Sequence, residues 1–277
     1  MDERQMDVRE LGLRPAQQEF VDRFMKACIE DERVVAAFLG GSYVKGKADE
    51  YSDVDLCLIT TEAAHEDVYR QREAFLQQLG ELVFLEDFGI PDIAFFIFAH
   101  GVEGELNFGS EDHLDKIHSG PFHVLLDKKK LLTRVDFSEP GADPSEQAEK
   151  LRLNISGFWH ELSHFTTAIG RGQLWWAGGQ LEALRSICVN LARLQNHFSN
   201  HEAGDEPYFK IENAMPVDKL EALKATFCPL EKSAMLASAH IILQFYAGTA
   251  TSLAQTHGIP YPLKLEKVMR ERLEKLL

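Results

Sequence analysis

The pattern of apolar residues changes near Asp136, and this change constrains the fold more than any other feature of the sequence. Before it, short apolar runs alternate with helical spacings; after it, apolar residues recur almost entirely at helical spacing. The two halves are separated by Asp136–Pro144 (DFSEPGADP), where two prolines and a glycine interrupt regular structure. We therefore expect an α+β protein, with a mixed sheet and flanking helices over residues 1–135, a linker over 136–145 and an all-α helical bundle over 146–277.

The elements expected within each half follow from the same patterns. Pro15 opens a helix, which is favourable in a first helical turn, and another helix is expected at residues 62–79. The expected strands cover residues 34–39, 54–59, 82–85, 93–99 and 105–108. In the second half, helices are expected over residues 146–170, 174–199, 229–256 and 263–276.

Charge and composition exclude several kinds of partner. The chain has 29 Lys and Arg against 44 Asp and Glu, a formal charge of −15, which repels phosphate backbones and anionic membranes. We therefore expect no nucleic-acid or membrane partner. The first residues are charged and do not resemble a signal peptide, and the four widely spaced cysteines indicate reduced thiols in a cytoplasmic protein.

The most informative motif lies between two expected strands of the first half. The first strand ends at Gly40-Gly41-Ser42, and the second opens with Asp53-Val-Asp55. Because side chains alternate along a strand, Asp53 and Asp55 point to the same face, and two adjacent carboxylates suit a hard cation such as Mg²⁺ or Mn²⁺. Glycine lets backbone N–H groups approach an anion, and the start of a short helix would add its dipole. A phosphate cradle beside a metal pair indicates phosphoryl or nucleotidyl transfer.

A third carboxylate is expected on a later strand. Glu105 alternates there with the apolar residues Leu106 and Phe108, so it faces away from them. An acid in that position can hold a metal or deprotonate an attacking hydroxyl. Lys45, just after Ser42, is a further candidate for triphosphate contact.

Together these residues resemble a known family. Gly41-Ser42 with Asp53-x-Asp55 is similar to the signature of the DNA polymerase beta-like nucleotidyltransferase superfamily. The surrounding stretch GGSYVKGKADEYSDVDLCLIT resembles its antibiotic-modifying branch, the aminoglycoside and lincosamide nucleotidyltransferases. The strand around Glu105 looks like the lincosamide-type strand that carries the catalytic acid, which in the family is often Asp.

The resemblance implies a fold and a reaction. It implies a nucleotidyltransferase fold followed by a helical domain, with Asp53 and Asp55 binding Mg²⁺ and Glu105 as the catalytic base. It further implies that Gly41, Ser42, Lys45 and Lys210 bind the nucleoside triphosphate. The implied reaction transfers AMP from ATP to a hydroxyl of a small molecule, an aminoglycoside- or lincosamide-type antibiotic, and releases pyrophosphate. It leaves open whether the chain forms a homodimer.

A second motif in the helical half points to different chemistry. His160-Glu161-Leu162-Ser163-His164 matches the H-E-x-x-H pattern of zinc hydrolases, in which two histidines on one helix face hold the metal. A third ligand is needed, and Glu182 is the candidate, although glycines lie between it and the motif. The simpler interpretation is an amphipathic helix with Trp159, Leu162 and Phe165 buried.

The sequence therefore leaves three alternatives to a small-molecule nucleotidyltransferase. One is a nucleotidyltransferase acting on a protein or RNA acceptor, of which RNA is disfavoured by the negative charge. The second is a zinc hydrolase using His160, Glu161 and His164. The third is a non-catalytic nucleotide-binding protein, which the adjacent acids Asp53, Asp55 and Glu105 disfavour because such a protein has no need to keep like charges together.

Overall fold

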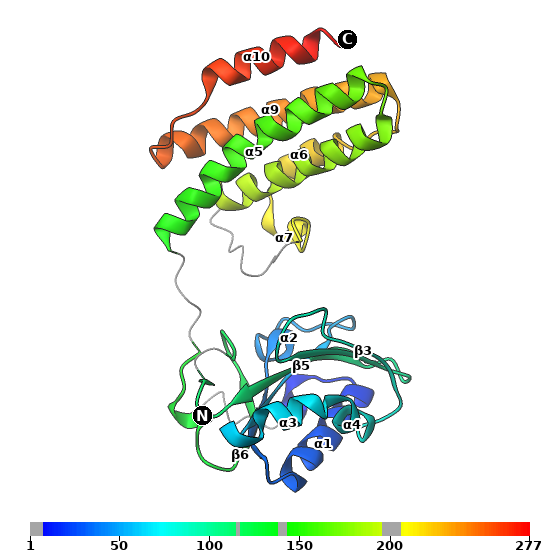
Figure 1. Ribbon diagram of the computed structural model, residues 1–277, viewed down its shortest axis with the longest axis vertical. Coiled ribbons are helices and arrows are strands. Elements are labelled where there is room, and N and C mark those ends of the chain that lie inside the picture. Colours follow the sequence, from blue (N-terminus) through cyan, green and yellow to red (C-terminus); the bar gives the residue numbers. More distant parts are fainter. Residues whose placement is uncertain (1–7, 115–116, 138–142, 196–205) are drawn as a thin grey trace. The chain divides into compact units, whose positions relative to one another are not determined.

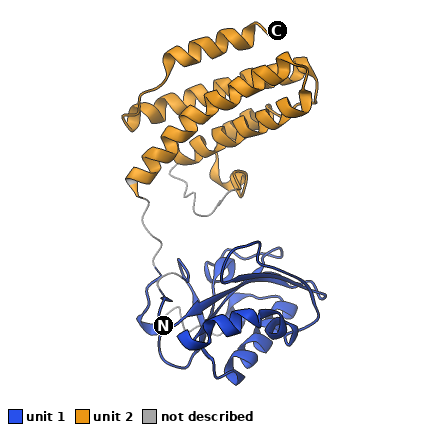
Figure 2. Ribbon diagram, in the orientation of Figure 1, with its two compact units in different colours: residues 1–141 blue, residues 142–277 orange. Residues whose placement is uncertain are grey.

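The computed structural model describes residues 8–114, 117–137, 143–195 and 206–277. The chain divides into two compact units, residues 1–141 and 142–277 (Figure 2). The first unit contains a six-stranded mixed sheet with helices against it, and the described second unit is helical. The expected α+β class is confirmed. The expected linker falls partly on residues 138–142, which lie outside the described residues.

The sheet of the first unit has the strand order β3-β4-β5-β2-β1-β6. Strands β2 and β5 are parallel, and every other neighbouring pair is antiparallel. Its strands are β1 (Val34–Leu39), β2 (Val54–Thr60), β3 (Leu82–Glu86), β4 (Ile93–Phe98), β5 (Glu103–Ser110) and β6 (His123–Asp127). The bounds of the first five were expected from apolar runs, whereas β6 was given no bounds.

One face of this sheet is covered by helices. Helices α1 (Pro15–Glu30), α3 (His65–Arg70) and α4 (Arg72–Gln77) lie on the same side of it (Figure 1). Their apolar side chains form one core with alternate residues of the strands, including Leu56, Leu106 and Phe108. The single helix expected at residues 62–79 is divided into a 3-10 turn, Glu62–Ala64, and two short helices that meet at Gln71.

The opposite face is covered over only part of its width. Phe122, Leu132 and Phe137 pack there against Phe38 of β1 and Cys57 of β2. On the β3–β4 side the same face is solvent-exposed, with Phe84 40% exposed and Ile97 37% exposed. The boundary between the covered and the exposed part therefore falls near β2 and β5.

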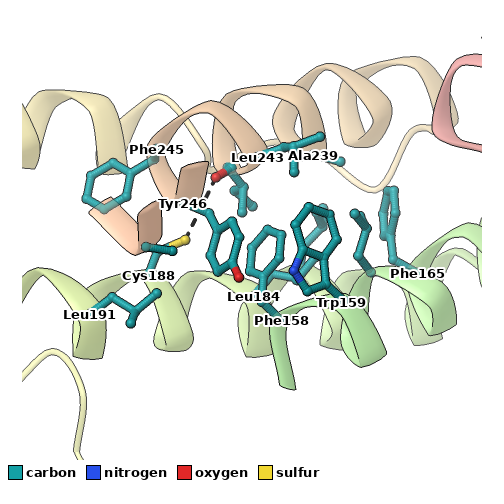
Figure 3. Close-up of a cluster of buried hydrophobic side chains, with 14 of the residues drawn as sticks. Phe158, Trp159, Phe165, Leu184, Cys188, Leu191, Ala239, Leu243, Phe245 and Tyr246 are labelled. Atoms are coloured by element: carbon teal, nitrogen blue, oxygen red, sulfur yellow. Dashed lines mark hydrogen bonds between the residues drawn. The ribbon is translucent and has the colours of Figure 1, made fainter. Parts of the chain in front are cut away.

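The described second unit is built on three long helices and further shorter ones. They are α5 (Pro144–Gly170), α6 (Leu174–Gln195), α7 (Ile211–Ala214), α8 (Val217–Lys224), α9 (Lys232–Thr256) and α10 (Leu263–Glu274). The rings of Phe158 and Tyr246 stack 3.6 Å apart between α5 and α9, and the Cys188 thiol lies 3.8 Å from the Ile242 carbonyl (Figure 3). The long helices were expected; residues 196–199 of the second one lie outside the described residues, and α7 and α8 were not expected.

Candidate active site

The two glycines after β1 form the first wall of the candidate site. Helix α2 (Gly41–Val44) begins there, and Gly41 has a φ of +66°, a conformation that favours glycine. A Cβ on Gly41 would lie 1.6 Å from the Asp55 carboxylate oxygen Oδ2. The Gly40 N–H donates to the Asp55 carbonyl at 2.9 Å. The turn therefore lies directly against Asp55. Only glycine, which has no side chain, permits this close approach.

Helix α2 is short, as the sequence pattern suggested. It contains four residues, so it supplies one turn of backbone and little aligned dipole. The Ser42 hydroxyl oxygen in this turn is buried and makes no hydrogen bond with the described residues. A buried hydroxyl of this kind is stabilised by a ligand that accepts or donates a hydrogen bond.

Asp53, Asp55 and Glu105 are brought together by the parallel pairing of β2 and β5. Asp55 and Glu105 are register partners in that pair, and Asp53 directly precedes β2. The neighbours Val54, Leu56 and Leu106 are buried in the helix-covered core, so the acids project from the opposite face. The structure thus assembles the acids that the sequence singled out from segments about 50 residues apart in the chain.

The proximity of these acids raises two of their pKa values. Burial, and then the negative charges of Asp53 and Glu105, raise the pKa of Asp55 to about 7, while the positive charge of Lys45 lowers it. Burial also raises the pKa of Glu105, opposed by a hydrogen bond that its Oε1 accepts from the Asn107 amide at 3.1 Å. A bound cation would relieve this repulsion.

A cavity of about 210 Å³ opens beside these acids. Its lining includes Gly40, Gly41, Lys45, Asp55 and Glu105. A larger depression of about 360 Å³ lies between α1 and α4. That depression is lined by residues of the helices and loops on the other side of the sheet. The smaller cavity is therefore the one lined by Asp55 and Glu105.

Two supporting residues were not identified from the sequence. Gln17 of α1 is 1% exposed; its Oε1 accepts from the Tyr43 hydroxyl at 2.5 Å, and its Nε2 donates to the Ser52 carbonyl at 2.8 Å. It therefore ties the turn containing Ser42 to the segment before Asp53. The sequence does contain a sign of this role, because Gln17 is a polar residue on the apolar face of the helix that begins at Pro15.

His118 is the second residue that sequence reasoning missed. Its imidazole lines the cavity, and its Cε1 lies 2.9 Å from the position that a Cβ on Gly40 would occupy. It packs edge-on against Phe38 and Phe137, and burial lowers its pKa. Gly40 is therefore needed for close packing here.

The H-E-x-x-H motif has the geometry of an ordinary amphipathic helix. Trp159, Leu162 and Phe165 are buried, while the rings of His160 and His164 lie 4.4 Å apart. Over residues 8–114, 117–137, 143–195 and 206–277, no three His, Cys, Asp or Glu side chains form a group able to hold a metal. The expected third ligand, Glu182, is ion-paired with Arg185 instead.

Among the described residues, the acids of the first unit likewise do not form a group of three able to hold a metal. Lys210, the remaining candidate for nucleotide binding, belongs to the second unit. It has a φ of +51° and precedes α7. Its role remains a prediction.

Comparison with known proteins decides the family. The model of the streptomycin adenylyltransferase family matches residues 15–276, nearly the whole chain. The chain belongs to the streptomycin adenylyltransferase family. It is therefore a nucleotidyltransferase, as the Gly-Ser and Asp-x-Asp motifs indicated.

Other comparisons are weaker. Among solved structures, an aminoglycoside 6-adenyltransferase from Bacillus subtilis is similar over 95% of this chain and 99% of its own, at 13% identity and a TM-score of 0.42. Among curated proteins, none is similar enough in sequence to be matched.

Proposed function

We propose that the chain is a Mg²⁺- or Mn²⁺-dependent adenylyltransferase. It moves AMP from ATP onto a hydroxyl of a small molecule, an aminoglycoside- or lincosamide-type antibiotic, and releases pyrophosphate. The observation that supports this most strongly is the pairing of Asp55 with Glu105 beside the Gly40–Ser42 turn in a member of this family. The native role that follows is antibiotic resistance.

The turn after β1 is proposed to bind the phosphates. Gly41 lets the turn pack against Asp55, and the buried Ser42 hydroxyl is available to hydrogen-bond with a phosphate oxygen. Lys45 lines the same cavity and supplies positive charge. These residues hold the triphosphate so that its α-phosphate faces the acceptor.

The acids fit a divalent cation. Carboxylate oxygens are the ligands Mg²⁺ prefers, and a bound cation would offset the burial and the negative charges of Asp53 and Glu105 that raise the pKa of Asp55. Asp53 and Asp55 would hold the ion. When bound, it supplies neutralisation of the phosphate charge and polarisation of the α-phosphate.

Glu105 is proposed as the general base. Its raised pKa makes it a stronger proton acceptor than a solvated glutamate, and the Asn107 amide fixes its side chain. It takes the proton of the acceptor hydroxyl; that oxygen forms a bond to the α-phosphorus as the bond from the α-phosphorus to the bridging oxygen breaks. The electron pair leaves with pyrophosphate.

Lys210 is proposed to contact the nucleotide phosphates. This assignment rests on the resemblance alone, because Lys210 belongs to the other unit. It is testable by the ATP affinity of Lys210→Ala. We also propose a cytoplasmic location, since all four cysteines are free thiols. No described helix is long and apolar enough to cross a membrane.

The decisive experiment is calorimetric titration of ATP with Mg²⁺ into the wild type and Asp53→Asn. We expect metal-dependent binding that is weakened at least ten-fold in the variant, followed by pyrophosphate release when streptomycin or lincomycin is added. Absence of binding of ATP, GTP, CTP and UTP to the wild type would contradict the proposal. Transfer of label to a protein but to neither antibiotic would favour the alternative of a protein acceptor.

A further inference from the structure

A cluster of three aromatic side chains, two of them exposed and one half-buried, lies on the same sheet face as the acids. Phe84 of β3, Phe88 of the following loop and Phe95 of β4 form it, and we call these residues the aromatic shelf. The ring of Phe88 lies 6.3 Å from that of Phe84 and 5.5 Å from that of Phe95. Phe88 is 67% exposed, which is unusual for phenylalanine in a folded domain.

Strand register connects this shelf to Glu105. Asp55 pairs with Glu105, Glu105 pairs with Phe95, and Phe95 pairs with Glu86, so one row crosses β2, β5, β4 and β3. Directly paired residues share a face of the sheet. The shelf therefore begins at the residue beside the proposed base and extends to the sheet edge.

Acidic residues alternate with the aromatic ones across this surface. In the next row of the register Phe84 pairs with Ile97 and Ile97 pairs with Glu103. Glu86 and Glu103 are both exposed. The surface combines apolar ring faces with carboxylates, and this combination attracts a cation that also has an apolar face.

We infer that the aromatic shelf is where the acceptor binds, with a ring of the acceptor on Phe88 and Phe95 and its protonated amine beside Glu86 and Glu103. This inference rests on the proposed function, because it takes the molecule on the shelf to be the one whose hydroxyl Glu105 deprotonates. The continuity of the shelf with Glu105 and the matching charge support this occupant. The ring lies on Phe95 and Phe88, and the amine lies among the glutamates.

The test separates binding from transfer. Kd values are measured by calorimetry, without nucleotide, for streptomycin, lincomycin and spermine, the last an amine without a ring. The proteins are the wild type, Phe88→Ala, Phe88→Tyr and Ile29→Ala. Ile29 is the matched control, because it is 56% exposed and lies on α1, against the other face of the sheet.

We expect at least one of the two antibiotics to bind the wild type and to bind Phe88→Ala at least five-fold more weakly. Phe88→Tyr and Ile29→Ala should stay within two-fold of the wild type, and spermine should not distinguish the four proteins. In turnover, Phe88→Ala should raise the acceptor KM and leave the ATP KM and kcat within two-fold.

Two results would overturn the inference. One is that neither antibiotic binds the wild type, or that Phe88→Ala binds them as well as the wild type does. The other is that the wild type sediments as a dimer and Phe88→Ala as a monomer, because the shelf then contacts a second copy of the chain. A third result would separate the two proposals. If antibiotic binding depends on Phe88 but the wild type transfers no AMP, the aromatic shelf is a binding site and the proposed function is wrong.

Discussion

Asp55 and Glu105 are register partners in the parallel strands β2 and β5, and each carries a carboxylate whose pKa is raised. Two acids side by side on a sheet face oppose folding unless a cation or a proton compensates them. The arrangement therefore lowers the stability of the ligand-free fold, and under the proposed function a bound cation would restore it.

The first prediction concerns the stability of the first unit against pH. Asp55 has a pKa of about 7 in the folded chain against 3.8 unfolded, so the folded state holds the proton more tightly. The contribution of Asp55 to the free energy of unfolding is therefore largest below pH 4. This contribution falls as the pH rises from 4 to 7, by at most about 4 kcal/mol. Asp55→Asn should abolish most of this decline.

All three tryptophans lie in the second unit, so fluorescence would not report on this effect. Hydrogen exchange of the β2 and β5 amides with EDTA present is the suitable measurement. Mg²⁺ added at pH 8 should slow exchange in the wild type more than in Asp55→Asn. Equal pH dependence in both proteins would show that Asp55 is not the group responsible.

The second prediction concerns the proposed base. Glu105→Gln removes the proton acceptor and keeps its size, so kcat should fall by a factor of about 10² to 10⁴. ATP affinity should change less than three-fold. Glu81→Gln is the matched control, because Glu81 is exposed and belongs to the first unit but lies before β3, away from the residues that line the cavity. A kcat for Glu105→Gln within three-fold of the wild type would assign the base elsewhere.

The third prediction separates backbone strain from steric conflict at the phosphate turn. Gly41 and Gly46 have φ values of +66° and +64°, but only at Gly41 would a Cβ meet another group, the Asp55 carboxylate. Gly46→Ala should therefore cost about 1 kcal/mol and keep ATP binding. Gly41→Ala should destabilise further and eliminate detectable ATP binding in calorimetry. If both variants bind ATP equally, the close approach at Gly41 is unimportant.

The fourth prediction concerns Gln17 as a positioning residue. Gln17→Met keeps the volume but leaves the buried Tyr43 hydroxyl and the Ser52 carbonyl without this partner, at a cost of about 1–3 kcal/mol. Because Gln17 joins the segments that carry Ser42 and Asp53, the ATP KM should rise while the acceptor KM stays unchanged. Gln18→Met is the control, because among the described residues the Gln18 side chain donates to Asp22 alone. A change in stability with no change in ATP KM would indicate a purely structural role.

The sequence analysis located most elements because their signals are local. The apolar run 34–39 and the spacing after Pro15 each depend on neighbouring residues, and β1 and α1 follow them closely. It gave no bounds for β6 because His123–Asp127 is only five residues long and gains its strand conformation by pairing with β1. It predicted one helix where the chain breaks at Gln71, since periodicity continues across the break.

The sequence by itself determined which carboxylates share a face of a strand and that glycine is needed before them. Strand alternation and backbone sterics are properties of a few consecutive residues, so Asp53, Asp55, Gly41 and Ser42 can be recognised in the linear chain. Only the tertiary structure decided that Glu105 stands beside Asp55, that Gln17 supports the turn and that Phe95 lies beside Glu105 on the same face. These relationships depend on strand order and register, which are set by non-local pairing and by burial of the whole core.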